Sequence, residues 1–181
     1  MLRNHVGPAP FEFSTKRENT MPSSSDIEAR FWDALAEDGT MMLGLDGLED
    51  GHVRPMTARF EEERGPIWFF TSTNNGVVEK LGQGQRAIAT FVSKKHEVLA
   101  TLHGTLSRDN DRATIDRLWN SYVAAWYEGG KYDPTLVLLR LDAERAQIWL
   151  DGSGVLGAIK VVLGLDPKKE FHDNVAKVTF T

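Results

Sequence analysis

Five short segments with the composition of β-strands follow one another between Thr40 and Leu106, and the links between them are short and polar. Each segment is rich in β-branched and aromatic residues or alternates apolar with polar ones, a pattern typical of strands. Because successive strands on short links pair as antiparallel neighbours, the pattern predicts a meander, which removes its own edges by closing into a barrel. The predicted strands are 40–45, 52–60, 67–71, 86–92 and 98–106.

Three further strand-like segments lie in the second half of the chain. Two of them, 136–141 and 145–150, flank a predicted turn at 142–144, and a short one covers 175–180. They would complete the sheet, so the fold class is predicted to be mainly β with α (α+β).

Two helices accompany these strands. Ser25 and Glu28 have the spacing of a capping box, and an apolar stripe that includes Phe31 follows, so we expect a first helix that covers a barrel end or a sheet face. A second helix would begin after a cap at Asp109 or Asn110 and continue to the Gly129–Gly130 pair.

The chain of 181 residues is 41% hydrophobic, which is enough apolar material for one sizeable core. Residues 1–23 contain three prolines and no sustained period, so we predict a disordered N-terminal tail followed by a single domain over 24–181. No role is predicted for residues 1–23 or for the segment 155–181.

Composition narrows the classes of function. The net charge is −5 and no basic stripe is present, so nucleic acid is not an expected partner. No apolar run approaches the roughly 20 residues of a membrane helix, and the first residues lack the layout of a secretory signal, so we expect a cytoplasmic protein without a membrane partner. The chain has no cysteine and its five histidines lack ligand spacing, so no metal site is expected.

A candidate ligand site lies where the strand predicted at 67–71 ends. A polar turn follows it, and Asn75 is a plausible N-cap for a short helix. The preceding strand carries Arg54 and Arg59, and guanidinium groups and a helix N-terminus both suit a phosphate. An ordinary capped turn is the alternative interpretation.

Aromatic residues form a second group of candidates. Trp119, Tyr122, Trp126 and Tyr127 have helical spacing, which favours packing in the core or in a dimer over a ligand site. Trp149 lies in a strand before a glycine-rich segment, where it would either line a pocket or serve packing alone.

Taken in order, the motifs HVRPM, IWFFTS and WYEGGKYDPTLVLLRLDAERAQIWLDG resemble those of the pyridoxamine 5′-phosphate oxidase-like flavoproteins, in particular the general stress protein branch. The resemblance covers about residues 26–154 and implies an FMN-binding split β-barrel with flanking helices, with FMN at the interface of a homodimer.

The resemblance also implies a set of cofactor-binding residues. Arg54 would contact the phosphate, helped by the start of the short helix. Trp149 matches an aromatic residue near the flavin ring. The full set is Arg54, Pro55, Met56, Thr57, Phe70, Thr71, Ser72, Asn75, Gly76, Lys80 and Trp149. Arg59 is an odd number of positions from Arg54, so it is expected on the opposite face of the strand.

Val77 departs from the family pattern, because relatives commonly carry a Lys at this helix position. We expect position 77 at an exposed helix end, with Lys80 one turn on as a substitute. Two functions follow. The first is an FMN-dependent oxidoreductase linked to the stress response, in which the protein orients the flavin and the cofactor does the redox chemistry. No residue is an evident acid, base or nucleophile, which leaves a second function open. The second is a non-catalytic stress protein that binds a flavin or another ligand, with FMN weak or absent.

Overall fold

The structure is a computed structural model and describes residues 22–48, 51–151 and 175–180. Most of the predicted tail and the segment 152–174 lie outside these residues. The helices are α1 (Ser24–Glu37), α2 (Gly76–Lys80), α3 (Arg112–Leu118) and α4 (Ser121–Ala124), with a short 3-10 helix η2 (Gly130–Tyr132). The strands are β1 (Thr40–Leu45), β2 (Arg54–Arg59), β3 (Ile67–Ser72), β4 (Gln85–Val92), β5 (Val98–Arg108), β6 (Leu136–Leu150) and β7 (Val175–Thr179).

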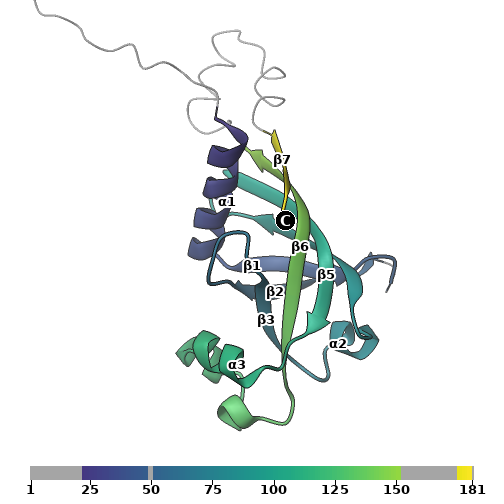
Figure 1. Cartoon of the computed structure of the whole chain (residues 1–181). Helices are drawn as coiled ribbons and strands as arrows, with labels where there is room; N and C mark the ends of the chain where they lie inside the picture. Colours follow the sequence, from purple (N-terminus) through teal and green to yellow (C-terminus); the bar gives the residue numbers. More distant parts are fainter. Residues whose placement is uncertain (1–21, 49–50, 152–174, 181) are drawn as a thin grey trace, which may run out of the picture.

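The strands form one antiparallel sheet in the order β3-β2-β1-β4-β5-β6-β7 (Figure 1). A further pairing of β3 with β6 closes the first six strands of this order into a barrel, and β7 extends the sheet beyond β6. The mainly β fold with flanking helices is therefore confirmed. None of the helices in the described ranges is long and apolar enough to cross a membrane.

Strand β6 differs from the prediction. Residues 136–150 form one continuous strand of 15 residues, so the predicted turn at 142–144 is wrong. The pairing with β5 instead shifts register between His103 and Gly104, and a Cβ atom on Gly104 would lie 2.1 Å from the carbonyl oxygen of Asp142. His103 pairs with Arg145 and Gly104 with Ala143, so the extra residue is Glu144 of β6, and the irregularity at 142–144 is a β-bulge rather than a turn.

Besides β5, strand β6 pairs with two other strands, one after the other along its length. Its first half pairs with β3 and closes the barrel, whereas its second half pairs with β7. β6 therefore runs nearly the full length of the molecule (Figure 1).

Helix α1 packs on the barrel wall near β7 (Figure 1). Phe31 and Trp32 are buried, and the ring of Phe31 lies edge-on to Phe91 of β4 with 5.8 Å between centroids. The helix begins two residues earlier than predicted. Its N-cap is Ser23, which forms a capping box with Asp26, so the predicted pairing of Ser25 with Glu28 is wrong.

Glu28 has a different role, because it is only 5% exposed and lies inside the first helix. Its two carboxylate oxygens accept hydrogen bonds of 2.7 and 2.6 Å from the guanidinium of Arg64, in the loop between β2 and β3. This hydrogen bonding raises the pKa of Arg64 above its ordinary value. The contact ties α1 to the hairpin that carries the candidate site.

The predicted second helix is interrupted. It begins after a cap at Asp111 rather than at Asp109 or Asn110, and it ends at Trp119, whose backbone is extended. Asn120 then caps α4 by accepting a hydrogen bond from the backbone N–H of Val123. The side chain of Asn120 competes with the helix backbone for N–H donors. It therefore divides the predicted helix into two shorter helices, α3 and α4.

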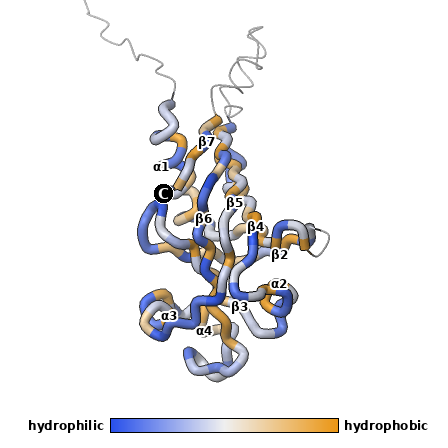
Figure 2. The backbone as a smooth tube through the Cα atoms, turned by 45° about the vertical axis from the view of Figure 1, so that its right-hand side comes forward, coloured by the Kyte–Doolittle hydropathy of each residue, from blue (hydrophilic) through white to orange (hydrophobic). Residues whose placement is uncertain are grey.

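These two helices cover the outer face of the barrel near the end of β3. α3 carries hydrophilic and hydrophobic stretches side by side (Figure 2), as expected of a helix with one face on a sheet. A second apolar cluster lies between them and the sheet. It contains Trp68, Ile115, Leu118, Val123, Tyr127, Leu136 and Leu138.

Candidate functional site

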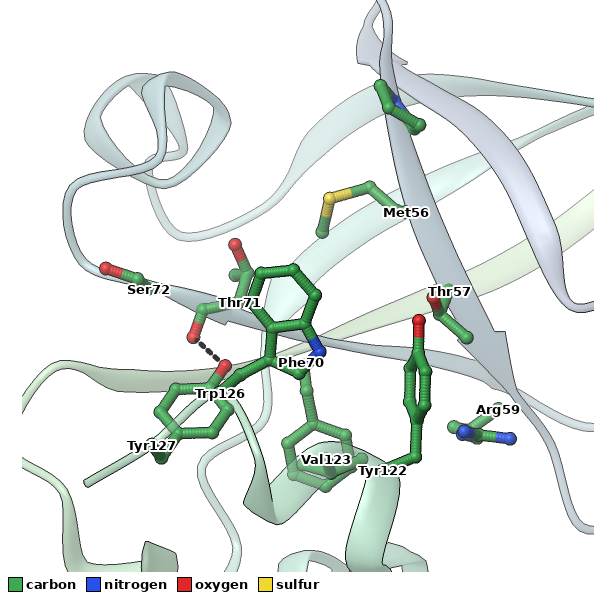
Figure 3. A pocket seen from close by; sticks show the side chains of 11 residues that line it. Met56, Thr57, Arg59, Phe70, Thr71, Ser72, Tyr122, Val123, Trp126 and Tyr127 are labelled. Carbon is green, nitrogen blue, oxygen red and sulfur yellow. Dashed lines mark hydrogen bonds between the residues drawn. The ribbon is translucent and has the colours of Figure 1, made fainter. Parts of the chain in front are cut away.

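The site begins with a gap between two strands. β2 pairs with β3 at only two positions, Ala58 with Phe69 and Arg59 with Trp68. Beyond them, residues 54–57 pair with β1 alone and residues 70–72 pair with β6 alone. The two strands therefore diverge and leave two backbone edges facing a space, as Figure 3 shows.

A pocket of about 300 Å³ occupies this space. Residues 55–57 and 70–72 supply its floor and two sides, and α4 with the turn after it supplies the third side (Figure 3). Its volume is near the lower end of the range for small-molecule sites. The lining residues are Pro55, Met56, Thr57, Arg59, Phe70, Thr71, Ser72, Tyr122, Val123, Trp126 and Tyr127.

Strand geometry explains which side chains line the pocket. Along β2, Met56 and Ala58 are buried toward the barrel core, whereas the alternate residues Thr57 and Arg59 are only partly covered. The pocket thus lies on the outer face of the barrel wall. Met56 belongs to the inward set and reaches the pocket through the gap between the strands.

Tyr127 anchors the third side of the pocket. Its hydroxyl donates a hydrogen bond of 2.7 Å to the backbone carbonyl of Thr71, and its side chain is 8% exposed. Burial, with a smaller contribution from the nearby Asp133 carboxylate, raises the pKa of Tyr127 to about 12. The phenol therefore stays protonated and acts as a fixed hydrogen-bond donor at neutral pH.

Aromatic side chains form the rim. Trp126 is 73% exposed and Tyr122 is 56% exposed, although both are large and apolar. Neighbouring aromatic side chains with this much exposed apolar surface make the rim a candidate interaction surface. Their helical spacing was visible in the sequence, but spacing alone does not distinguish a rim from a core.

Arg59 is the positively charged residue in the lining of the pocket. Its guanidinium carbon lies 5.9 Å from the centroid of the Tyr122 ring. Its buried Nε atom has no hydrogen-bond partner, the one side-chain atom of this kind in the described ranges. No carboxylate lines the pocket, so this end of it is electropositive.

The structure brings together six of the residues expected from the family resemblance, because Pro55, Met56, Thr57, Phe70, Thr71 and Ser72 all line the pocket. Asn75 and Gly76 lie beside it. Asn75 caps α2 as predicted, and its amide nitrogen is 3.9 Å from the sulfur of Met56. Arg54 and Lys80 do not line the pocket, nor does Trp149.

Trp149 is remote from the pocket of its own chain. It lies 12 residues beyond Val137, the partner of Thr71, which is about 40 Å along β6 at about 3.3 Å per residue. Its neighbours across the sheet are Leu99 on β5 and Val175 on β7. A single chain therefore cannot place Trp149 against a ligand in the pocket.

Val77 is also placed differently from the expectation. It is 0% exposed and belongs to the main core, so position 77 is not an exposed helix end. The first turn of α2 is turned toward the barrel, and its exposed residues are Glu79 and Lys80. A lysine in place of Val77 would require a different placement of this helix.

The chain is similar to a known protein family and to several solved structures. The sequence matches the family described as pyridoxamine 5′-phosphate oxidase like over residues 26–165. No curated protein matches it.

Solved structures give closer relatives. The chain is 58% identical to a general stress family protein of Xanthomonas campestris, covering 74% of this chain and 93% of that one with a TM-score of 0.70. It is 59% identical to the general stress FMN/FAD binding protein of Xanthomonas citri, with coverage of 72% and 92% and a TM-score of 0.68. A general stress protein 26 of Jannaschia is 28% identical, with coverage of 86% and 99% and a TM-score of 0.70.

Proposed function

Because the chain belongs to the pyridoxamine 5′-phosphate oxidase-like family, we propose that it binds FMN in the gap between β2 and β3 and acts as a cytoplasmic flavin-dependent oxidoreductase linked to the stress response. The relative from Xanthomonas citri, described as an FMN/FAD binding protein, supports the choice of a flavin. The divergence of the two strands is the observation that carries the proposal.

The gap suits a flat ring with polar edges. Backbone N–H and C=O groups of residues 55–57 and 70–72 border it, and such groups are able to hydrogen-bond the polar edge of a flavin. Phe70 and Trp126 add flat apolar surfaces. When bound, FMN would supply the redox chemistry, and the protein would orient the ring and limit the access of water.

The phosphate end of FMN is proposed at the turn between β3 and α2. Ser72 lines the pocket and its hydroxyl already accepts a hydrogen bond from the backbone N–H of Asn74, which leaves its own proton to donate. The amide group of Asn75 lies next to Met56, on the same side of the pocket. Arg54 and Lys80 are the cations proposed to act at this end.

A homodimer is part of the proposal. Val92, Leu99, Trp149 and Val175 are cross-strand neighbours and form an apolar row on the outside of the sheet. Val92 in this row is 49% exposed. A second copy packed on this row would cover it and would bring its own Trp149 toward the flavin of the first chain.

A non-catalytic flavin- or ligand-binding protein is the second candidate. The pocket lining contains no carboxylate and no histidine, and the phenol of Tyr127 stays protonated. These features leave the protein without a general base in the pocket. The buried Val77 also supplies no charge to a phosphate, which favours weak FMN binding.

Two measurements separate these candidates. The visible absorption spectrum of the purified protein and a titration with FMN test binding, and we expect micromolar or tighter affinity. Anaerobic addition of NADPH or NADH to the flavin-loaded protein, followed by air, then tests turnover by loss and recovery of flavin absorbance. Binding without bleaching would favour the non-catalytic candidate, and no binding would contradict the flavin proposal.

A further inference from the structure

The thioether of Met56 is the one sulfur-containing group in the pocket lining of the described residues. Met56 belongs to the inward set of β2, but its side chain projects into the space between β2 and β3 (Figure 3). The residue is only 7% exposed and it lines the pocket, so solvent reaches its sulfur through the pocket. A small solute that enters the pocket therefore meets this thioether.

Asn75 contacts the sulfur of Met56 from one side. The side-chain oxygen of Asn75 accepts a hydrogen bond of 3.0 Å from the backbone N–H of Val77, which fixes the orientation of the amide. The NH2 end of the amide therefore faces Met56, with 3.9 Å between Nδ2 and Sδ. A thioether is a weak acceptor with two lone pairs, and the amide engages one of them. The other lone pair is left for a solute in the pocket.

Hydrogen peroxide is an oxidant that suits this arrangement, because it is small and uncharged. The open lone pair of the sulfur attacks one peroxide oxygen, the O–O bond breaks, and the second oxygen leaves as water after proton transfer. The sulfur loses two electrons and the peroxide gains two, so the product is methionine sulfoxide. The reaction converts an apolar side chain into a polar one.

We propose that Met56 is an oxidation site, at which peroxide forms a sulfoxide whose oxygen points into the gap and weakens flavin binding. The effect on the flavin rests on the proposed function, because residues 55–57 border the proposed position of the ring. The added oxygen would occupy part of a pocket of about 300 Å³ and would lose its water when a flat ring covers it. Peroxide would thus lower the flavin occupancy, and a methionine sulfoxide reductase would restore it.

Two adjacent methionines of β1 are internal controls for access to the sulfur. Met41 is 0% exposed and lies in the main core, whereas Met42 is 37% exposed on the opposite face of the strand. Neither lines the pocket. Met41 is the sheet partner of Met56, so these two residues share a location and differ in their access to the pocket.

The first experiment treats the full chain with hydrogen peroxide, with and without saturating FMN, and follows each methionine by peptide mass spectrometry. In the protein without FMN, Met42 should oxidise fastest, and Met56 should oxidise at least about tenfold faster than Met41, because oxidation follows exposure. FMN should slow the oxidation of Met56 and leave that of Met42 unchanged. Peptides treated with reductases specific for each sulfoxide epimer should show one predominant epimer at Met56, because one side of its sulfur is open.

A second experiment measures the effect on binding, by titration with FMN before and after peroxide treatment. The wild type and Met42→Leu should each lose about tenfold or more in affinity, because the new oxygen is desolvated when the ring binds. Met56→Leu should show no change on treatment. Each variant is compared with its own untreated form, which removes the effect of the substitution itself, and thermal unfolding verifies that it is folded.

The outcomes distinguish the oxidation site from the flavin proposal. Oxidation of Met56 no faster than that of Met41, or equal amounts of the two epimers, would overturn the site. So would an unchanged FMN affinity in protein whose Met56 is fully oxidised. Selective oxidation of Met56 to one epimer in a protein that does not bind FMN would support the site and contradict the proposed flavin function.

Discussion

The phenolic oxygen of Tyr127 lies 2.7 Å from the backbone carbonyl oxygen of Thr71, which is 56 residues earlier in the chain. This hydrogen bond joins the turn after α4 to β3 and so holds the aromatic rim over the gap. Because the contact is buried, it contributes to the stability of the protein and to the dependence of that stability on pH.

Tyr127→Phe removes the hydroxyl and leaves the Thr71 carbonyl without this donor. The free energy of unfolding should fall by about 1 kcal/mol, the usual value for a buried neutral hydrogen bond. Urea denaturation measures the change. Tyr132→Phe is the matched control, since Tyr132 is 80% exposed and its hydroxyl makes no hydrogen bond that would be lost. An equal effect of both substitutions would contradict the role of the Tyr127 contact.

The stability of the protein should also fall as the pH rises through the range from about 10 to about 12. The pKa of Tyr127 is raised to about 12 in the folded protein, whereas an unfolded tyrosine titrates near its ordinary value of 10. Above pH 10 the unfolded state therefore releases a proton that the folded state retains, which favours unfolding. The slope of the unfolding free energy against pH in this window should be smaller in Tyr127→Phe than in the wild type.

Val77→Lys should destabilise the protein and should not restore phosphate binding. Val77 is fully buried in the core, so the substitution buries an ammonium group without a partner and is expected to cost roughly 3 kcal/mol or more. Thermal unfolding measures the effect. Glu79→Lys, on the exposed side of the same helix, is the control and should change stability little. A stable Val77→Lys variant with tighter FMN binding would show that α2 is able to turn this position outward.

Arg54→Ala tests the proposed phosphate end of the site. We expect affinity for FMN to fall about ten- to a hundredfold, which corresponds to the loss of a charge-assisted hydrogen bond of roughly 1.5–3 kcal/mol. Affinity for riboflavin should change little, because riboflavin has no phosphate. Parallel fluorescence titrations at two salt concentrations provide the comparison, and Arg30→Ala controls for the loss of charge. Equal losses for both ligands would place the phosphate elsewhere.

Much of the barrel was predictable because strand periodicity is a local signal. The segments around β1 to β5 alternate clearly, and the Asn75 cap of α2 was recognised from one residue and its context. The continuity of β6 was not predictable, because its bulge at Glu144 depends on the close approach of Gly104 in another strand. The start of α1 was predicted wrongly for a similar reason. Glu28 has the spacing of a capping-box residue, but its carboxylate binds Arg64 in a distant loop, and this contact is not visible in the local sequence.

The candidate site was predicted in part. The strand residues that line the pocket followed from the family resemblance, but the rim residues Tyr122 and Trp126 did not. Their spacing fits a core as well as a surface, and exposure depends on the break at Asn120 that divides the helix. Arg59 was predicted to point away from Arg54, but only the position of α4 brings it beside a pocket.

The gap between β2 and β3 also bears on aggregation. Two backbone edges that do not pair with each other offer a place where a strand from another molecule could add to the sheet. Pro55 stands on one of these edges and has no N–H to donate, so an intruding strand would lack a hydrogen bond there. A proline at this position therefore protects a binding gap that has to stay open from being filled by a neighbouring chain.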